Sequence, residues 1–313
     1  MNLLKIAQMT DDDARAYLEG IRWPNGPRCP HCGTRYPHRI TGKATSRHPA
    51  RKGLYKCAGP KCRRQFTVTV GTIFERSHLP LGKWIAAFHL MTSSKKGISA
   101  HQLHRMLEVT YKTAWFMAHR IRHAMSEQPL KRKLQGIVEA DETFIGGKPR
   151  RRNATRGAEG RPVAGAIRRP KAPVLGLVER DGKARALALE TVTPAEIKGH
   201  MQTHVSRLAR IMTDEAGHYR KIGDHFDGHQ AVKHSMGEYA RGHVSTNQVE
   251  GFFSMVKRQY HGTHHHYSRQ HMQKYLDEMA FRWNGRKMND SDRRDEAVRS
   301  AEGKRLTYRD PGK

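Results

Sequence analysis

The sequence predicts an α/β domain with a mixed sheet and helices on both faces, preceded by a small metal-binding region and a helical region. Three observations support this prediction. All four cysteines lie between residues 29 and 62, helical periodicity follows over residues 80–126, and strands then alternate with helices from residue 136 onwards. A chain of 313 residues is long enough for two or three domains with cores of their own.

The composition is strongly basic. The chain has 58 Lys and Arg against 29 Asp and Glu, a formal net charge of +29. Such cations neutralise phosphates and release counterions, so nucleic acid is the expected partner. A membrane surface is the alternative, but the charge is spread over the chain and is not confined to one amphipathic helix. Without an apolar run of about 18 residues or a signal peptide, we expect a cytoplasmic, nucleoid-associated protein that does not contact a membrane.

Residues 1–27 are predicted to hold an N-terminal helix, and residues 28–72 a zinc ribbon. Thr10 can cap a helix over 10–22. The cysteines then form two pairs, Cys29 with Cys32 and Cys57 with Cys62. Thiolate pairs at these separations fit one tetrahedral, structural Zn²⁺, and the confinement of every cysteine to them argues against a disulfide framework. Two unrelated buried cysteine pairs are the alternative.

Residues 78–130 are predicted to be helical. A helix over 98–107, a turn over 108–111 and a helix over 112–121 follow one another. With Lys112 and Arg120 exposed, this arrangement would resemble a DNA-reading helix-turn-helix. An ordinary helical hairpin is the alternative.

Residues 134–286 are predicted to form an RNase H-like domain. The expected elements are strands at 136–144, 174–178 and 184–191, a helix from Thr193, a strand at 210–213, a helix at 216–222, a strand at 232–236, and helices at 245–258 and 268–283. Asp181-Gly182 is a hairpin signal between the second and third strands. Three hairpin-linked strands followed by strands with helical crossovers are typical of the RNase H-like arrangement. Residues 287–313 are expected to be a polar C-terminal tail.

A basic segment interrupts this domain. Residues 148–171 hold nine Lys and Arg and one acid, and they include Arg150, Arg151 and Arg152. The segment is expected to be either a solvated surface loop or a phosphate-binding arm, disordered without DNA in both cases.

The helix at 245–258 is predicted to have one apolar face and one polar face. Ser245 and Gln248 fit a capping box at its start. One face is apolar, made by Val249, Phe252, Phe253 and Val256. The other face is polar, made by Asn247, Glu250, Ser254 and Lys257. A carboxylate and a cation two turns apart suit metal-dependent phosphate chemistry, although a surface Glu and Lys would give the same pattern.

Three acids of this domain are expected to meet. Asp141 lies in the first strand, Asp214 ends the fourth, and Glu250 lies in the later helix. In an RNase H-like sheet these places converge on one edge, where crowded carboxylates repel one another unless cations share them. Mg²⁺ is the expected cation, and two ions about 4 Å apart would suit an in-line phosphoryl displacement. For any single acid, capping a loop or pairing with an arginine is the alternative.

The chain resembles bacterial insertion-sequence transposases with an N-terminal zinc ribbon and an acidic-triad (DDE-type) catalytic domain. The resemblance covers about residues 10–286 and is carried by the stretches 23–33, 66–72, 138–148, 213–215, 246–258 and 275–284. It implies that Asp141 and Asp214 are metal ligands. Such families have Asn or Glu at the third position, and of Asn247 and Glu250 we favour Glu250 as the stronger Mg²⁺ ligand.

The resemblance also implies roles for other residues. Lys257 would grip the DNA strand near the scissile phosphate, with Arg258 beside it as a further DNA contact. Glu139 and Glu142 are expected to face away from Asp141 and to be structural.

The function implied is that of a DNA transposase. It would recognise the element's ends with the zinc ribbon and helix-turn-helix, cut there with Mg²⁺ or Mn²⁺, and join the 3′-hydroxyl to target DNA, acting on double-stranded DNA as a dimer or larger assembly. The alternatives are an inactive, transposase-derived zinc-dependent DNA-binding protein and a junction-cutting nuclease of the same fold.

Overall fold

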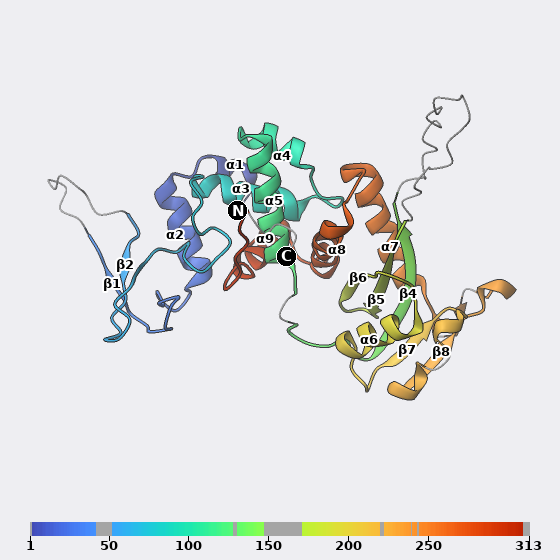
Figure 1. Ribbon diagram of the computed structural model, residues 1–313. Helices are drawn as coiled ribbons and strands as arrows, with labels where there is room; N and C mark the ends of the chain where they lie inside the picture. Colours follow the sequence, from blue (N-terminus) through green and yellow to red (C-terminus); the bar gives the residue numbers. More distant parts are fainter. Residues whose placement is uncertain are drawn as a thin grey trace, which may run out of the picture. The chain divides into compact units, whose positions relative to one another are not determined.

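The computed structural model describes residues 2–41, 52–127, 130–146, 171–219, 222–238, 240–242 and 244–308. The chain forms two compact units (Figure 1), a first unit of Met1–Ser126 with Gly285–Lys313 and a second unit of Glu127–Asn284. The second unit is therefore an insertion between two segments of the first. In the described ranges, no helix combines the length and apolar character needed to span a bilayer.

The first unit begins with two helices and a small sheet. These are α1 (Leu3–Ala7), α2 (Asp11–Arg22), β1 (His38–Arg39), β2 (Tyr55–Lys56) and β3 (Gln65–Phe66), with the strands paired antiparallel in the order β1-β2-β3. Thr10 caps α2 through a capping box with Asp13, as its sequence predicts. Strand β3 ends at Phe66, because the chain turns where the Val70 N–H donates to the Thr67 carbonyl.

Helix α3 (Leu81–Ser93) is the centre of the first unit. It contacts α1, α2, α4 (Ala100–Leu107), α5 (Tyr111–Met125) and α9 (Asp290–Arg299). Its Trp84, Ile85, Phe88 and Met91 are fully buried, as their helical spacing predicts. Helix α9 lies in the segment that the sequence predicts to be a polar tail. Its polar sequence gives little signal because one of its buried residues, Arg294, is charged and pairs with Asp295.

The second unit has the predicted RNase H-like sheet. Its five strands lie in the order β6 (Ala184–Ala188), β5 (Ala172–Glu179), β4 (Ile137–Ile145), β7 (Arg210–Thr213) and β8 (Gly228–Ala231). The pairs β4–β5 and β5–β6 are antiparallel, whereas β4–β7 and β7–β8 are parallel. The hairpin-linked strands thus precede the crossover-linked ones, which confirms the fold class.

Helices cover both faces of this sheet. Strand β5 alternates between them: Leu175 and Leu177 pack with α6 (Pro194–His204), while Val174 and Val178 pack with α7 (Asn247–Gln259) and α8 (Arg269–Asn284). A π-helical turn, η4 (Tyr260–His264), follows α7. The polar side of α7 therefore points away from the sheet.

Two short elements differ from their predictions. The helix expected over 216–222 is reduced to the 3₁₀ turn η1 (Gly217–Tyr219), and the strand expected over 232–236 lies earlier, at β8. Further turns and a small hairpin follow: η2 (Gly223–His225), η3 (His234–Met236), β9 (Ala240–Arg241) and β10 (Val244–Ser245). Segments this short carry too few residues for a hydrophobic period to fix their bounds.

Candidate active site and metal centre

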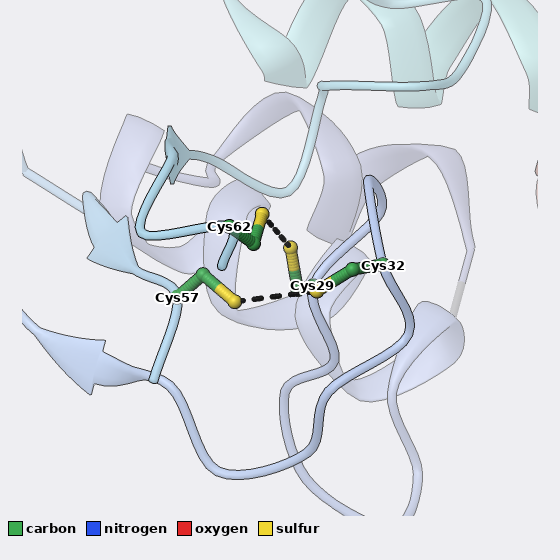
Figure 2. A group of neighbouring side chains, drawn as sticks. All are labelled: Cys29, Cys32, Cys57 and Cys62. Atoms are coloured by element: carbon green, nitrogen blue, oxygen red, sulfur yellow. Dashed lines mark hydrogen bonds between the residues drawn. The ribbon is translucent and has the colours of Figure 1, made fainter. Parts of the chain in front are cut away.

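The four cysteines of the first unit converge on one point (Figure 2). Their sulfurs lie within 4.8 Å of one another, with Cys29 and Cys62 at 3.9 Å and Cys32 and Cys57 at 3.4 Å. Tetrahedral Zn²⁺ with Zn–S bonds near 2.3 Å holds its sulfurs about 3.8 Å apart. The separations therefore fit one zinc ion and are too long for disulfides.

The turns around the sulfurs are those of a metal knuckle. Gly33 takes a positive φ of 76° and its N–H donates to the Cys29 carbonyl, while the Gly59 N–H donates to the Cys57 sulfur at 3.3 Å. Burial raises the pKa of the Cys29 thiol, whereas the nearby Thr34 hydroxyl lowers that of Cys32. A buried thiol of this kind loses its proton readily only beside a cation, so the donor set suits a bound metal.

In the second unit, the sheet register aligns two of the predicted acids. Strand β4 pairs parallel with β7, Val138 opposite Ile211 and Glu139 opposite Met212. The same offset aligns Asp141 with Asp214, the residue after the end of β7. Neighbouring strands are about 4.8 Å apart, so the two acids lie side by side at the edge where β7 ends.

A glycine brings the third acid's helix to the same place. On β5, Gly176 pairs with Asp141. A Cβ at Gly176 would lie 2.6 Å from the Phe253 ring and 2.9 Å from Val249 Cγ2, closer than atoms can approach. The missing side chain therefore lets α7 pack tightly against the sheet beside Asp141, and Glu250 follows Val249 directly.

The pKa of Asp141 indicates that the acids lie near one another. Burial, followed by the charges of Asp214, Glu142 and Glu250, raises its pKa to about 7, although the Glu142 N–H donates to its Oδ1 at 2.7 Å. The acids predicted from sequence are therefore close enough to interact. In the described part of the chain only the cysteines have all ligand atoms within 4.8 Å, so the carboxylates form a looser group.

The two predicted faces of α7 are present. Val249, Phe252, Phe253 and Val256 are buried, while Asn247, Glu250, Ser254 and Lys257 are exposed. The Thr246 hydroxyl donates to Glu250 Oε1 at 3.0 Å, and the Ala216 N–H donates to Asp214 Oδ1 at 3.0 Å. The carboxylates of Glu250 and Asp214 thus each accept a hydrogen bond from a neighbouring residue of the chain.

The prediction that a capping box of Ser245 and Gln248 begins α7 is wrong. The helix begins at Asn247, and its N-cap Thr246 makes no side-chain capping bond. Ser245 instead accepts a hydrogen bond from Arg180 Nη2 at 3.1 Å. The Gln248 and Val249 N–H groups donate to Glu139 Oε2, at 2.8 and 3.1 Å.

The expectation that Glu139 faces away from Asp141 is also wrong. Residues two apart on a strand share a face, so Glu139 lies on the α7 side with Asp141. Glu142 does face the other side, where its carboxylate accepts from the Tyr219 hydroxyl and hydrogen-bonds His218 Nε2 at 2.9 Å. Period-two alternation was the signal that could have separated these two acids in the sequence.

The predicted DNA contacts differ in exposure. Lys112, Lys257 and Arg258 are exposed, and the Lys112 ammonium lies 4.9 Å from the Tyr308 ring centre. Arg120 is buried, contrary to expectation: it donates to the Glu75 carbonyl at 2.7 Å and stacks over Trp84. Burial lowers its pKa to about 10. Arg150, Arg151 and Arg152 lie outside the described residues.

The fold and these residues define an RNase H-like domain with clustered acids, joined in one chain to a cysteine ribbon. Two family models match the same parts: the ISXO2-like transposase domain over residues 133–284 and the transposase zinc-ribbon domain over residues 9–65. The chain therefore belongs to the family of insertion-sequence transposases with a zinc ribbon and a DDE-type domain.

The chain is also similar to individual known proteins. The "Uncharacterized protein in transposable element ISH50" of Halobacterium salinarum is 27% identical over 247 residues, covering 77% of this chain and 80% of the relative. The crystal structure of the Mos1 strand transfer complex is 16% identical, covers 71% of this chain and 79% of that one, and has a TM-score of 0.29. The Mos1 mariner paired end complex with Mn is 17% identical, covers 66% and 75%, and has a TM-score of 0.27. At these scores the structural likeness adds nothing to the argument for the site.

Proposed function

We propose that this protein is a DNA transposase that cleaves at the ends of its element and joins the freed 3′-hydroxyl to target DNA. The supporting observation is the gathering of Asp141, Asp214 and α7 at one edge of an RNase H-like sheet, in a chain of the transposase family. The electrostatic interaction of Glu250 with Asp141 supports Glu250 as the third acid.

The donor set of this site fits a hard divalent cation. Its groups are carboxylate oxygens, which Mg²⁺ and Mn²⁺ favour, and burial together with the neighbouring acids raises the pKa of Asp141. Asp141, Asp214 and Glu250 would hold the ions, and Glu250 is preferred to Asn247 because an anionic carboxylate binds Mg²⁺ more strongly than an amide does. Two such ions, when bound, activate the attacking oxygen and stabilise the leaving one.

Basic residues of the chain would hold the DNA. Lys257 lies two turns beyond Glu250 on the exposed side of α7, within reach of a phosphate near the scissile bond, and Arg258 is beside it. Lys112 and the basic residues Arg150, Arg151 and Arg152 are further proposed contacts, whereas the burial of Arg120 argues against it. The net charge of +29 supports a double-stranded DNA partner. We further propose that a dimer or larger assembly binds this DNA at the nucleoid.

The four cysteines are proposed to bind one structural Zn²⁺, which would make the ribbon a folded module for recognising the element's ends.

Cleavage of a supercoiled plasmid carrying the element's ends tests the activity. With Mg²⁺ the protein should relax the plasmid and then join cut ends to a second DNA. Asp141→Asn and Asp214→Asn should each abolish cleavage while DNA binding in a mobility-shift assay persists. Full cleavage by either variant would refute the site, and DNA binding without cleavage by the wild-type protein would favour an inactive DNA-binding descendant.

A further inference from the structure

We propose that Glu139 is a positioning residue whose buried carboxylate ties β4, which carries Asp141, to the first turn of α7, which carries Glu250. This inference rests on the proposed function, since it concerns how the third carboxylate is held beside the other two.

One oxygen of Glu139 holds the start of α7. Its Oε2 accepts the N–H groups of Gln248 and Val249, the second and third residues of the helix. These are the N–H groups that an N-cap side chain usually satisfies, and Thr246 leaves them open because its hydroxyl donates to Glu250. An acid 109 positions earlier than Gln248 therefore caps the helix, and its charge lies at the positive end of the helix dipole.

The other oxygen of Glu139 binds Arg180, which lies in the turn between β5 and β6. Its Oε1 accepts from Arg180 Nη2 at 2.8 Å and Nε at 3.2 Å. Arg180 Nη2 also donates to Ser245 Oγ, and the Arg180 backbone N–H donates to the Ile137 carbonyl on β4. The tie thus links β4, the turn after β5, and the residues that lead into α7.

These contacts also explain why Glu139 is not itself a candidate ligand. It shares a face with Asp141, yet its side chain is 0% exposed and its two oxygens already accept four hydrogen bonds. A carboxylate takes about four such bonds, so no acceptor position is left for a cation. Its effect on metal binding must pass through the place that it gives to α7.

Removing the charge of Glu139 should therefore weaken cation binding by the three proposed metal ligands. In Glu139→Gln, the Arg180 guanidinium loses its buried counter-charge and the helix loses an anionic cap. Displacements of about 1 Å are enough to impair a catalytic constellation. Glu250 follows Val249 directly, so its carboxylate should move when the first turn of α7 moves.

The test compares Glu139→Gln with a matched control, Glu196→Gln, in the full-length protein. Glu196 also accepts two backbone N–H groups, those of Glu190 and Thr191 at 2.8 and 3.0 Å, but it belongs to α6 on the other face of the sheet. Two quantities are measured: the Kd for Mn²⁺, from the electron paramagnetic resonance signal of the unbound ion, and the Mg²⁺ concentration for half-maximal plasmid cleavage.

Glu139→Gln should raise both quantities at least tenfold with DNA affinity unchanged, and Glu196→Gln should change neither by more than twofold. A wild-type Mn²⁺ Kd in a folded Glu139→Gln, or an equal loss in both variants, overturns the positioning role. Should Glu139→Gln fail to fold, as loss of its thermal transition would show, Arg180→Lys is measured instead. As a second variant, Glu139→Asp keeps the charge but shortens the side chain by one carbon, so its carboxylate cannot hold both Arg180 and the helix N–H groups. Whichever of Arg180→Lys and Glu139→Asp folds is measured, and an unchanged Mn²⁺ Kd in Glu139→Asp overturns the proposal.

Asp141→Asn separates this inference from the proposed function. If that variant keeps both Mn²⁺ binding and cleavage, the proposed function fails. If it loses both while Glu139→Gln loses neither, the proposed function stands and the positioning role fails.

Discussion

The cysteine cluster of the first unit and the carboxylate cluster of the second reach their geometry by different routes. The sulfurs come from two turns within 34 residues, Cys29 to Cys62, and lie within 4.8 Å of one another. The acids come from two strands and a helix that span residues 141–250, and they form a looser group in which Asp141 has a raised pKa. Local turns assemble the first site, whereas register and helix packing assemble the second.

Because the two sites are assembled differently, their folds should depend on metal to different degrees. The ribbon has short strands and a small core, so its fold should depend on the metal. The RNase H-like unit has apolar clusters on both faces of a five-stranded sheet, so it should fold without metal. Its acids should then cost stability, which a bound cation would offset.

The largest expected effect is on the ribbon. Cys29→Ser removes one of four thiolates, and structural Zn²⁺ contributes about 10 kcal/mol or more to folding in zinc-finger peptides. We expect loss of bound zinc, loss of hydrogen-exchange protection around β2 and β3, and weaker binding to the element's ends. The second unit should keep its protection, and Asp141→Asn is the control that should keep its zinc. Unchanged zinc content in Cys29→Ser would contradict the ribbon's metal site.

A smaller but decisive effect separates the two candidates for the third ligand. Glu250→Gln should reduce cleavage by at least about 100-fold, because even partners of metal ligands are worth roughly 10–100-fold. Asn247→Ala, one turn away on the same exposed face, should reduce it by less than about tenfold. Initial rates of plasmid cleavage at saturating Mg²⁺ measure both, with DNA affinity as the control. The reverse ranking would assign the third position to Asn247.

The smallest effect concerns stability without Mg²⁺. The pKa of Asp141 in the fold, about 7, lies above its ordinary value of 3.8, so between these pH values the folded chain holds a proton that the unfolded chain has lost. Stability therefore falls as pH rises from about 4 to about 7. Asp141→Asn should stabilise the metal-free second unit at pH 8 by about 2 kcal/mol, roughly half of the full linkage value because the carboxylate keeps some contact with water.

Hydrogen exchange over β4 measures that free energy of opening. Asp181→Asn, in the exposed β5–β6 turn, is the matched control and should change it by less than about 0.5 kcal/mol. Equal stability of Asp141→Asn and the wild-type protein at pH 8 would show that the acids do not strain the metal-free fold.

The sequence predicts the parts of each site that depend on local pattern. Cysteine spacing is enough for the ribbon, and strand order is enough to bring Asp141 and Asp214 to one edge. The two faces of α7 follow from its 3.6-residue period. Family resemblance adds the choice of acids, which composition alone does not provide.

What the sequence does not predict depends on contacts between distant segments. Ser245 and Gln248 match a capping box, but Arg180 binds Ser245 and Glu139 binds the helix, so tertiary contacts replace the local motif. Arg120 is charged and was expected to be exposed, yet its guanidinium stacks on Trp84 and donates to a backbone carbonyl. Polar residues with buried partners give no apolar period to detect.

The most direct measurement is a crystal structure of the full chain soaked with Mn²⁺, with anomalous scattering used to locate the ion. Manganese should appear between Asp141 and Asp214 with an oxygen of Glu250 among its ligands, while zinc occupies the four cysteines. A filled cysteine site with no manganese at the acids, or manganese held by other residues, would contradict the account.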